Sequence, residues 1–193
     1  MTICKFCNHK NPPLNLFCQA CSKILPVAEV SYFDLLDLTP IFTLDRDLLD
    51  SKFHQKLAKI HPDKFVGHTS KEMELALDYA AAITAAYETL KSKNSQAEYL
   101  LSMHGYSLDS IKPDDNSILE MMEWREQLDN ISDRAGAKLL LHSMERIEKS
   151  AWLELENAFA VSQYPAAQAT LAKIKFVSRF IEELDAKINN LAE

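Results

Sequence analysis

One tripeptide, His61-Pro62-Asp63, constrains the fold of this chain more than any other feature of the sequence. Apolar residues recur at helical spacing before and after it, so a helix is expected on each side. Proline disfavours helical backbone at the preceding residue and lacks the N–H that would continue the ladder, so the first helix must end here. The pattern predicts an antiparallel helical hairpin with the tripeptide on its connecting turn. The two stripes are Leu49, Phe53, Leu57 and Ile60, then Ala76, Tyr79, Ile83, Tyr87 and Leu90.

The composition favours a mainly helical globular protein and excludes some function classes. Of the 193 residues 47% are hydrophobic, 25% are charged and only three are glycine. No apolar run approaches the roughly 20 residues of a membrane helix, so we expect no membrane contact. A net charge of −7 argues against general nucleic-acid binding, which needs a basic footprint.

The compartment is expected to be reducing, and two compartments fit. Cys4 comes too early for the charged region and apolar core of a signal peptide. The first 30 residues contain no Arg, unlike a mitochondrial transit peptide. We therefore expect a cytoplasmic protein of the bacterial cytosol, with a mitochondrial-matrix form carrying a processed leader as the alternative.

All four cysteines lie in one short N-terminal segment, as two C-x-x-C pairs separated by ten residues. Two such pairs can supply four thiolates in tetrahedral geometry, which predicts a structural zinc site. Turn-tolerant Asn8 and Ser22 follow the second cysteine of each pair. Iron in a rubredoxin-like site is the lesser alternative, and two disulfides would need an oxidising compartment. The predicted metal ligands are Cys4, Cys7, Cys18 and Cys21.

Positive charge follows one face of the helix that precedes the tripeptide. Lys52, Lys56 and Lys59 are spaced by four and three residues, and Lys64 extends the patch past the turn. Such a stripe is commonly just a solvated face. Beside His-Pro-Asp we interpret it as a surface that docks on an acidic partner.

The C-terminal half predicts a three-helix bundle. Helical patterns cover about 118–131, 134–160 and 164–191, and a shorter helix over 97–106 ends at Gly105. Residues 113–116 form the expected boundary before the bundle. The expected core includes Leu139, Leu140, Ile147, Leu153, Leu155, Phe159, Leu171, Ile174, Val177, Phe180, Ile181, Leu184 and Ile188.

Two stretches of the chain carry a family resemblance. His61-Pro62-Asp63, with Phe53 before it and Ile83, Ala86, Tyr87 and Leu90 after it, resembles the J-domain that activates DnaK-type ATPase chaperones. The stretch Ala97-Glu98-Tyr99-Leu100-Leu101-Ser102-Met103-His104-Gly105-Tyr106 resembles HscB, the J-type co-chaperone family of iron–sulfur cluster biogenesis.

The resemblance implies a mainly α, L-shaped fold and a function as an adaptor rather than an enzyme. The implied domains are a tetracysteine zinc-knuckle module at 1–28, a J-domain hairpin with its linker helix at 29–108, and a C-terminal three-helix bundle at 114–193. An HscA/DnaK-type ATPase chaperone would bind one surface and an IscU-type iron–sulfur scaffold another. The implied chaperone-binding residues are His61, Pro62, Asp63, Lys52, Lys56, Lys59 and Lys64. The implied scaffold-binding residues are Ile118, Leu119, Met122, Glu123, Glu126 and Phe176.

Three other functions compete with this interpretation. The first is a J-domain co-chaperone for general unfolded clients, which would use the zinc module and the bundle to bind them. The second is a zinc-ribbon nucleic-acid-binding protein, which Lys5, Lys10 and Lys23 favour but the net charge opposes. The third is a metalloenzyme at His54, His61 and Asp63. Leu119 and Met122 could also be bundle core rather than interface.

Overall fold

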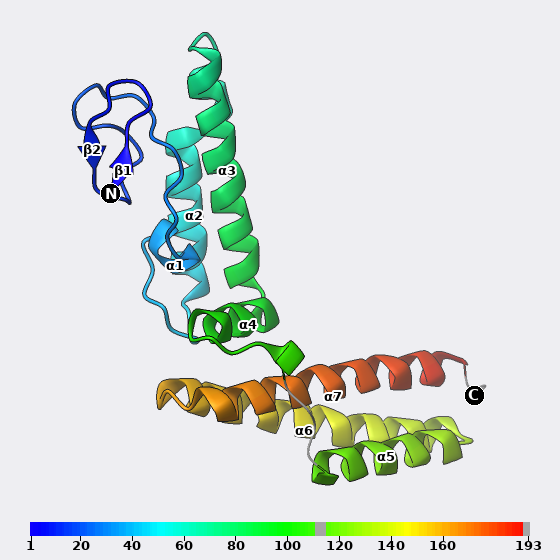
Figure 1. The fold of residues 1–193 in the computed structure, drawn as a ribbon. Helices are drawn as coiled ribbons and strands as arrows, with labels where there is room; N and C mark the ends of the chain where they lie inside the picture. Colours follow the sequence, from blue (N-terminus) through cyan, green and yellow to red (C-terminus); the bar gives the residue numbers. More distant parts are fainter. Residues whose placement is uncertain (111–114, 191–193) are drawn as a thin grey trace. The chain divides into compact units, whose positions relative to one another are not determined.

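A computed structural model describes residues 1–110 and 115–190, and it divides into two compact units (Figure 1). The first unit is Met1–Gln96 and the second begins at Ala97. The fold is mainly α-helical, as the sequence predicts. The three-domain division remains a prediction, and its expected boundary at 113–116 lies partly outside the described residues.

The N-terminal segment of the first unit is a small structure without helices. Its two short strands, β1 (Thr2–Ile3) and β2 (Lys10–Asn11), pair antiparallel, and an isolated bridge joins Phe17 to Ile24. Cys4, Cys18 and Leu25 are buried together in its centre. So few apolar residues cannot form a core of ordinary size, which agrees with a segment organised around its cysteines.

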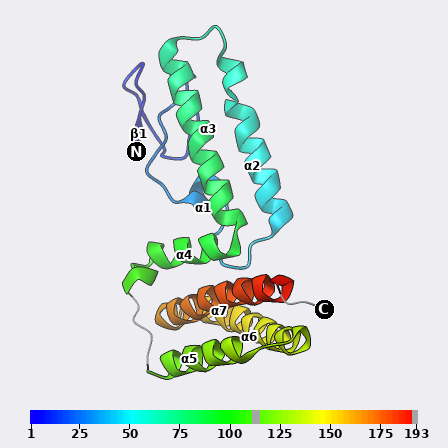
Figure 2. The same cartoon turned by 90° about the vertical axis from the view of Figure 1, so that its right-hand side faces the viewer.

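A helical hairpin forms the rest of the first unit, as predicted (Figure 2). Its two long helices run antiparallel and a short 3₁₀ helix lies in their connection. The side chains of Ser31, Asp45 and Thr69 cap three of the helix N-termini, and Thr69 forms a reciprocal capping box with Glu72. The elements are α1 (Tyr32–Leu35), α2 (Arg46–Ile60), η1 (Pro62–Phe65) and α3 (Ser70–Lys91).

Side chains fix the register of α2 against α3. The rings of Phe53 and Tyr87 stack with centroids 4.1 Å apart, and the Tyr87 hydroxyl donates to Asp50 Oδ1 at 2.9 Å. The Arg46 guanidinium donates to the carbonyls of Leu90 and Lys91, two of the groups that the end of a helix leaves unpaired. These contacts hold the base of the hairpin and thereby place its turn at the opposite end.

The first helix is shorter than the sequence predicts. The expected span is 32–38, with Pro40 as the stop, but α1 ends at Leu35. Asp37 adopts a left-handed conformation with φ of 52°, and the N–H of Leu38 then bonds back to the carbonyl of Phe33. This closure satisfies a terminal carbonyl and ends the helix before the proline is reached.

The second unit contains most of α4 (Lys93–Met103), then η2 (Leu108–Ser110) and a bundle of α5 (Asp115–Asn130), α6 (Arg134–Ala160) and α7 (Tyr164–Asn190). The helices α6 and α7 pack along one another (Figure 1). Two expected core residues, Leu139 and Leu153, are exposed, because the inner face of α6 is instead formed by Leu140, Met144, Ala151 and Leu155.

None of the described helices is long and apolar enough to cross a membrane.

Candidate functional sites: cysteine cluster, hairpin turn and apolar helix face

The four cysteines come together as the sequence predicts. Sγ atoms lie 3.6 Å apart in the pairs Cys4–Cys21 and Cys7–Cys18, and all four lie within 4.8 Å of one another. All four are free thiols. Zn–S bonds of about 2.3 Å in a tetrahedron require sulfurs about 3.8 Å apart, so the cluster fits a four-thiolate metal ion.

The two C-x-x-C pairs have the same backbone geometry, so the cluster is built from two similar knuckles. The N–H of Phe6 points to Cys4 Sγ and the N–H of Ala20 to Cys18 Sγ, each at 3.4 Å. Asn8 and Ser22 have φ of 58° and 57°, so the expected turn-tolerant residues do adopt left-handed backbone.

Hydrogen bonds also favour the thiolate form at one of the four sulfurs. Burial opposes ionisation of Cys18, but N–H donors from the backbone of Cys21 and Ala20 and from the Asn11 amide outweigh it. The pKa of the Cys18 thiol falls to about 6. Because a metal binds thiolates rather than thiols, these donors favour the form of the Cys18 sulfur that a metal requires.

The rival metal site is not formed. Among residues 1–110 and 115–190, the four cysteines are the one group of three or more potential ligands that assembles. His54, His61 and Asp63 border a shared open depression, but they do not converge as a ligand set. The metalloenzyme interpretation therefore loses its site.

The hairpin turn presents the side chains of His61 and Asp63 to solvent. His61 follows α2 as its C-cap with non-helical backbone, and its Nδ1 accepts the N–H of Asp63 at 3.4 Å. The Asp63 carboxylate also lies 3.4 Å from that nitrogen and is exposed. Phe65, at the end of η1, is buried and anchors the turn to the hairpin. The result is a polar tip with an apolar anchor, which suits contact with another protein.

The lysines of the basic stripe fall into two kinds. Lys59 and Lys64 are exposed, and Lys52 is partly so. The Lys56 side chain is only 11% exposed, and its ammonium pairs with Asp37 at 2.8 Å. That lysine ties α2 to the segment after α1, so it has an internal role that its sequence spacing does not reveal.

One face of α5 is apolar and exposed. Leu119 and Met122 are 57% and 64% exposed, and Ile118 beside them is exposed too, so these residues are not bundle core. Glu123 and Glu126, also exposed, border them. The core contribution of α5 comes instead from Trp124 and Leu128. Bulky apolar side chains edged by carboxylates are typical of a partner surface.

Phe176 on α7 is half-buried rather than free. Its ring packs against Trp124 with centroids 6.0 Å apart and against Phe180 at 6.5 Å. An ion pair between Lys173 and Glu120, 3.2 Å long, joins α7 to α5 next to this stack. The six expected scaffold-binding residues therefore lie on two helices that contact one another.

Comparisons with known proteins assign the family. Residues 114–185 match the family model described as the HSCB C-terminal oligomerisation domain. The co-chaperone protein HscB homologue of Vibrio vulnificus (strain YJ016) is 31% identical over 163 residues, which cover 81% of this chain and 95% of that protein. The chain belongs to the HscB co-chaperone family. The homologue from Vibrio cholerae serotype O1 (strain M66-2) is 30% identical with the same coverage.

Solved HscB structures share the fold. Human co-chaperone HscB superposes with a TM-score of 0.83 at 24% identity, covering 96% of this chain and 98% of that one. The chaperone HscB from Vibrio cholerae gives a TM-score of 0.70 at 30% identity, covering 84% and 100%.

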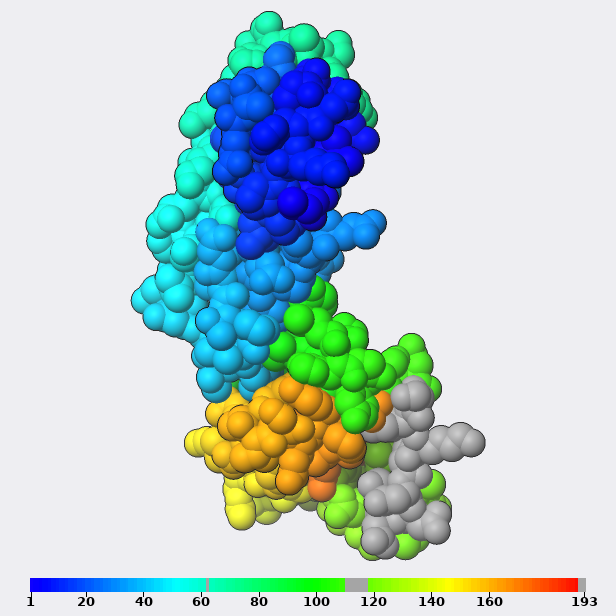
Figure 3. Space-filling model, turned by 60° about the vertical axis from the view of Figure 1, so that its left-hand side comes forward, coloured from blue at the N-terminus to red at the C-terminus, as the bar shows by residue number. Residues whose placement is uncertain are grey.

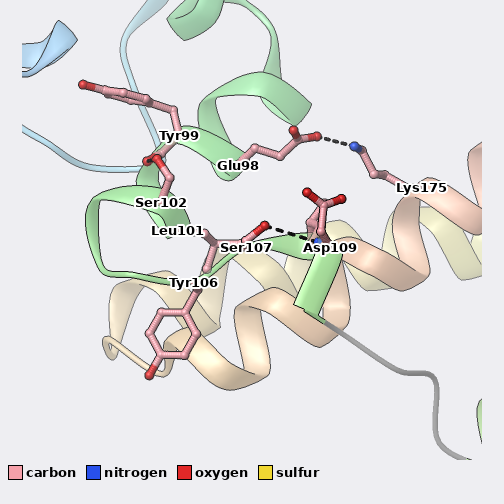
Figure 4. A pocket seen from close by; sticks show the side chains of 9 residues that line it. Glu98, Tyr99, Leu101, Ser102, Tyr106, Ser107, Asp109 and Lys175 are labelled. Atoms are coloured by element: carbon pink, nitrogen blue, oxygen red, sulfur yellow. Dashed lines mark hydrogen bonds and ion pairs between the residues drawn. The ribbon is translucent and has the colours of Figure 1, made fainter.

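A polar hollow of about 360 Å³ lies within the second unit of this HscB family member (Figure 4). Glu98 of α4 and Lys175 of α7 form an ion pair across one side. Gln168 donates to the carbonyl of Ser107, which holds the connecting segment against α7. The hollow is thus a seam between elements of one unit, bridged by the chain's own polar groups.

Sequence reasoning about this HscB chain missed Glu72. It reads as an ordinary first-turn carboxylate of α3, yet its side chain is only 7% exposed and lies 3.1 Å from Lys23 Nζ. No spacing rule links residues 23 and 72. The one available signal was the capping-box pattern of Thr69 and Glu72, which fixes the carboxylate but not its distant partner.

Proposed function

We propose that this protein is a non-enzymatic adaptor that binds an IscU-type iron–sulfur scaffold and stimulates the ATPase of an HscA/DnaK-type chaperone. The carrying observation is the His61-Pro62-Asp63 turn between two helices of an HscB family member, with the side chains of His61 and Asp63 exposed. The co-chaperone names of the relatives agree with it.

The chaperone contact is assigned to the turn and the lysines near it. His61 and Asp63 contribute shape and hydrogen bonds, while Lys59 and Lys64 add positive charge that attracts an acidic surface and sets register. Lys52 contributes from the partly exposed side of α2. Lys56 contributes less, because Asp37 already neutralises it. Hydrolysis takes place on the chaperone, so these residues act by binding.

The scaffold contact is assigned to the exposed face of α5, with Phe176 as its neighbour on α7. Ile118, Leu119 and Met122 offer apolar area, and Glu123 and Glu126 form a charged edge. Association at such a patch gains free energy by removing apolar surface from water. Simultaneous binding of scaffold and chaperone would let the two contacts couple through the chaperone's conformational states.

The metal of the cysteine cluster is proposed to be zinc in a structural role. Four thiolates complete a tetrahedron and leave no open position for substrate or water. Unpaired thiols held together suit a reducing compartment, and we propose the bacterial cytosol with the mitochondrial matrix as the alternative.

The test is ATP hydrolysis by a DnaK-type chaperone, measured with this protein in the presence and absence of IscU. We expect stimulation that rises more than additively when IscU is added. The His61→Gln variant should leave hydrolysis at the chaperone's basal rate while its circular dichroism and IscU affinity stay unchanged. Normal stimulation by that variant would refute the chaperone assignment.

The IscU arm of the same experiment separates the proposed function from the general-client alternative. Stimulation that IscU leaves unchanged, together with binding of a denatured protein, would replace the cluster-transfer function with a general one. Binding of IscU without any effect on hydrolysis would instead keep the scaffold patch and remove the coupling.

A further inference from the structure

A partly buried ion pair joins the cysteine module to the start of α3, beside the hairpin turn. Lys23 Nζ lies 3.1 Å from Glu72 Oε2, and both residues belong to the first unit. Figure 3 shows the N-terminal segment, in dark blue, lying against the hairpin next to the teal loop between α2 and α3. The contact therefore connects the cysteine cluster with the part of the hairpin that carries the tripeptide.

The module holds Lys23 in place from two directions. Its carbonyl accepts the N–H of Cys18 at 2.8 Å, so its backbone belongs to the second knuckle. Its ammonium lies 4.7 Å from the centre of the Phe6 ring, and Phe6 packs on the buried cysteine cluster. Loss of the metal would release the knuckle and so remove the support of this ammonium.

Glu72 connects Lys23 to the loop that precedes α3. Its carboxylate accepts from the Thr69 hydroxyl at 2.7 Å and from the Thr69 N–H at 3.3 Å, and lies 3.5 Å from His68 Nδ1. The N–H of His68 bonds to the carbonyl of Phe65 at 2.9 Å, and the two rings make an edge contact with centroids 5.4 Å apart. An unbroken series of contacts thus runs from Lys23 to the last residue of η1.

We propose that Lys23 and Glu72 are positioning residues for the chaperone-binding turn, and that the metal of the cysteine cluster controls that turn through them. The proposal rests on the proposed chaperone contact of residues 61–64. A carboxylate this buried needs compensation, and Lys23 supplies it only while the knuckle is folded. The folded module therefore holds the first turn of α3 in place through this ion pair.

The experiment uses the full-length, metal-loaded protein and four single variants. Lys23→Met and Glu72→Gln remove one charge each from the link with little change in size. Lys71→Met and Glu74→Gln are the matched controls, because these residues form an exposed ion pair of 2.9 Å near the start of the same helix. Circular dichroism and bound zinc are checked for each variant.

The first readout is amide hydrogen exchange in peptides covering 61–73. We expect exchange to accelerate about tenfold in Lys23→Met and Glu72→Gln, and to stay within about twofold of wild type in both controls. The Lys23→Met/Glu72→Gln double variant should exchange no faster than the faster single variant, because both changes break one link.

The second readout is removal of the metal with a strong chelator, followed by the same exchange measurement. We expect the loop of the wild-type protein to accelerate about tenfold, and the loop of Lys23→Met to change by less than about twofold. Equal acceleration in both proteins would show that the metal acts on the loop by another route and would overturn the proposal.

The third readout separates this inference from the proposed function. If wild type stimulates the chaperone, Lys23→Met should raise the concentration giving half-maximal stimulation about fivefold to tenfold while the maximal rate stays near wild type. A wild type that does not stimulate refutes the proposed function, whereas unchanged exchange and half-maximal concentration in both link variants refute the inference alone. Should Glu72→Gln fail to fold, the partly exposed Lys23→Met still decides the question.

Discussion

At the scale of single residues, the structure assigns different tasks to side chains that look alike in the sequence. Lys56 and Lys59 are both part of one basic stripe, yet Lys56 forms an ion pair with Asp37 whereas Lys59 is exposed. Glu72 and Glu74 are both early carboxylates of α3, yet only Glu72 is buried. Burial and partner, rather than residue type, decide whether such a charge stabilises the fold or meets a partner protein.

Glu72 predicts a pH dependence of stability in the first unit. The Thr69 hydroxyl, followed by Lys23 and the Thr69 N–H, lowers the pKa of the Glu72 carboxyl from 4.5 to about 2. A lowered folded-state pKa stabilises the protein at pH above the unfolded value, and this stabilisation is lost as pH falls from about 4.5 towards 2. The melting temperature of Glu72→Gln should therefore fall less steeply with decreasing pH than that of wild type across this range.

Glu74→Gln is the control for that measurement, because the Glu74 carboxylate pairs on the surface. The curve of Glu74→Gln shows how much a surface carboxylate of the same helix contributes, and the difference between wild type and Glu72→Gln reports on the Glu72 link. Parallel curves for wild type and Glu72→Gln would contradict the prediction.

At the scale of helices, much of the fold could be predicted from local pattern. The tripeptide fixed the end of α2, and the capping residues Ser31, Asp45 and Thr69 marked three helix starts. Apolar periodicity located α5, α6 and α7 to within a few residues, apart from the start of α5. These features depend on neighbours a few positions away, so a sequence can reveal them.

Features that depend on distant residues could not be predicted. Leu139 and Leu153 have the side chains of core residues, but the direction from which α5 and α7 approach α6 leaves them outside. The left-handed Asp37 ended α1 earlier than Pro40 would have done. The cysteine spacing did predict the cluster, since four ligands for one ion must converge, but nothing local could place Lys23 beside Glu72.

The two sides of α5 predict opposite mutational effects. Met122→Glu on the exposed face should change the free energy of unfolding by less than about 0.5 kcal/mol. The same variant should weaken IscU binding about tenfold, because a charge replaces apolar contact area. Trp124→Ala in the core should cost about 3 kcal/mol of stability. Urea unfolding and calorimetric titration with IscU measure the two effects.

A loss of stability in Met122→Glu comparable with that of Trp124→Ala would show that the exposed face is packed after all. Unchanged IscU affinity in a well-folded Met122→Glu would remove α5 from the proposed scaffold surface.

At the scale of the whole molecule, the proposed contacts divide between two units. The cysteine cluster and the hairpin turn belong to the first, whereas the α5 face and Phe176 belong to the second. Each unit has its own buried apolar residues, so we expect a perturbation at the cysteines to act first on the hairpin of the same unit. Metal content is therefore expected to affect the chaperone contact and to leave the scaffold contact alone.

This division predicts a selective response to zinc. A metal that binds only the folded module stabilises it by about 1.4 kcal/mol for each tenfold rise in free zinc above the dissociation constant. Hydrogen exchange in β1, β2 and the start of α3 should slow accordingly as buffered zinc rises. Exchange in α6 and α7 should not respond, and an equal response there would contradict the separation of the units.

Because the two C-x-x-C pairs share one backbone geometry, the folding of the cysteine module can be tested separately from its contact with the hairpin. His9 and Lys23 are equivalent, since each carbonyl accepts the N–H of the first cysteine of its own pair, at 3.0 and 2.8 Å. The cluster uses only the backbone carbonyls of these two residues, so we expect it to tolerate a lysine at either position. The hairpin, in contrast, contacts the lysine side chain at position 23 through Glu72. Exchanging the two residues keeps the composition and the four ligands of the module, and we expect it to remove the ion pair with Glu72 while the module stays folded. Structural support and communication with the turn are thus separable properties of one small symmetric motif.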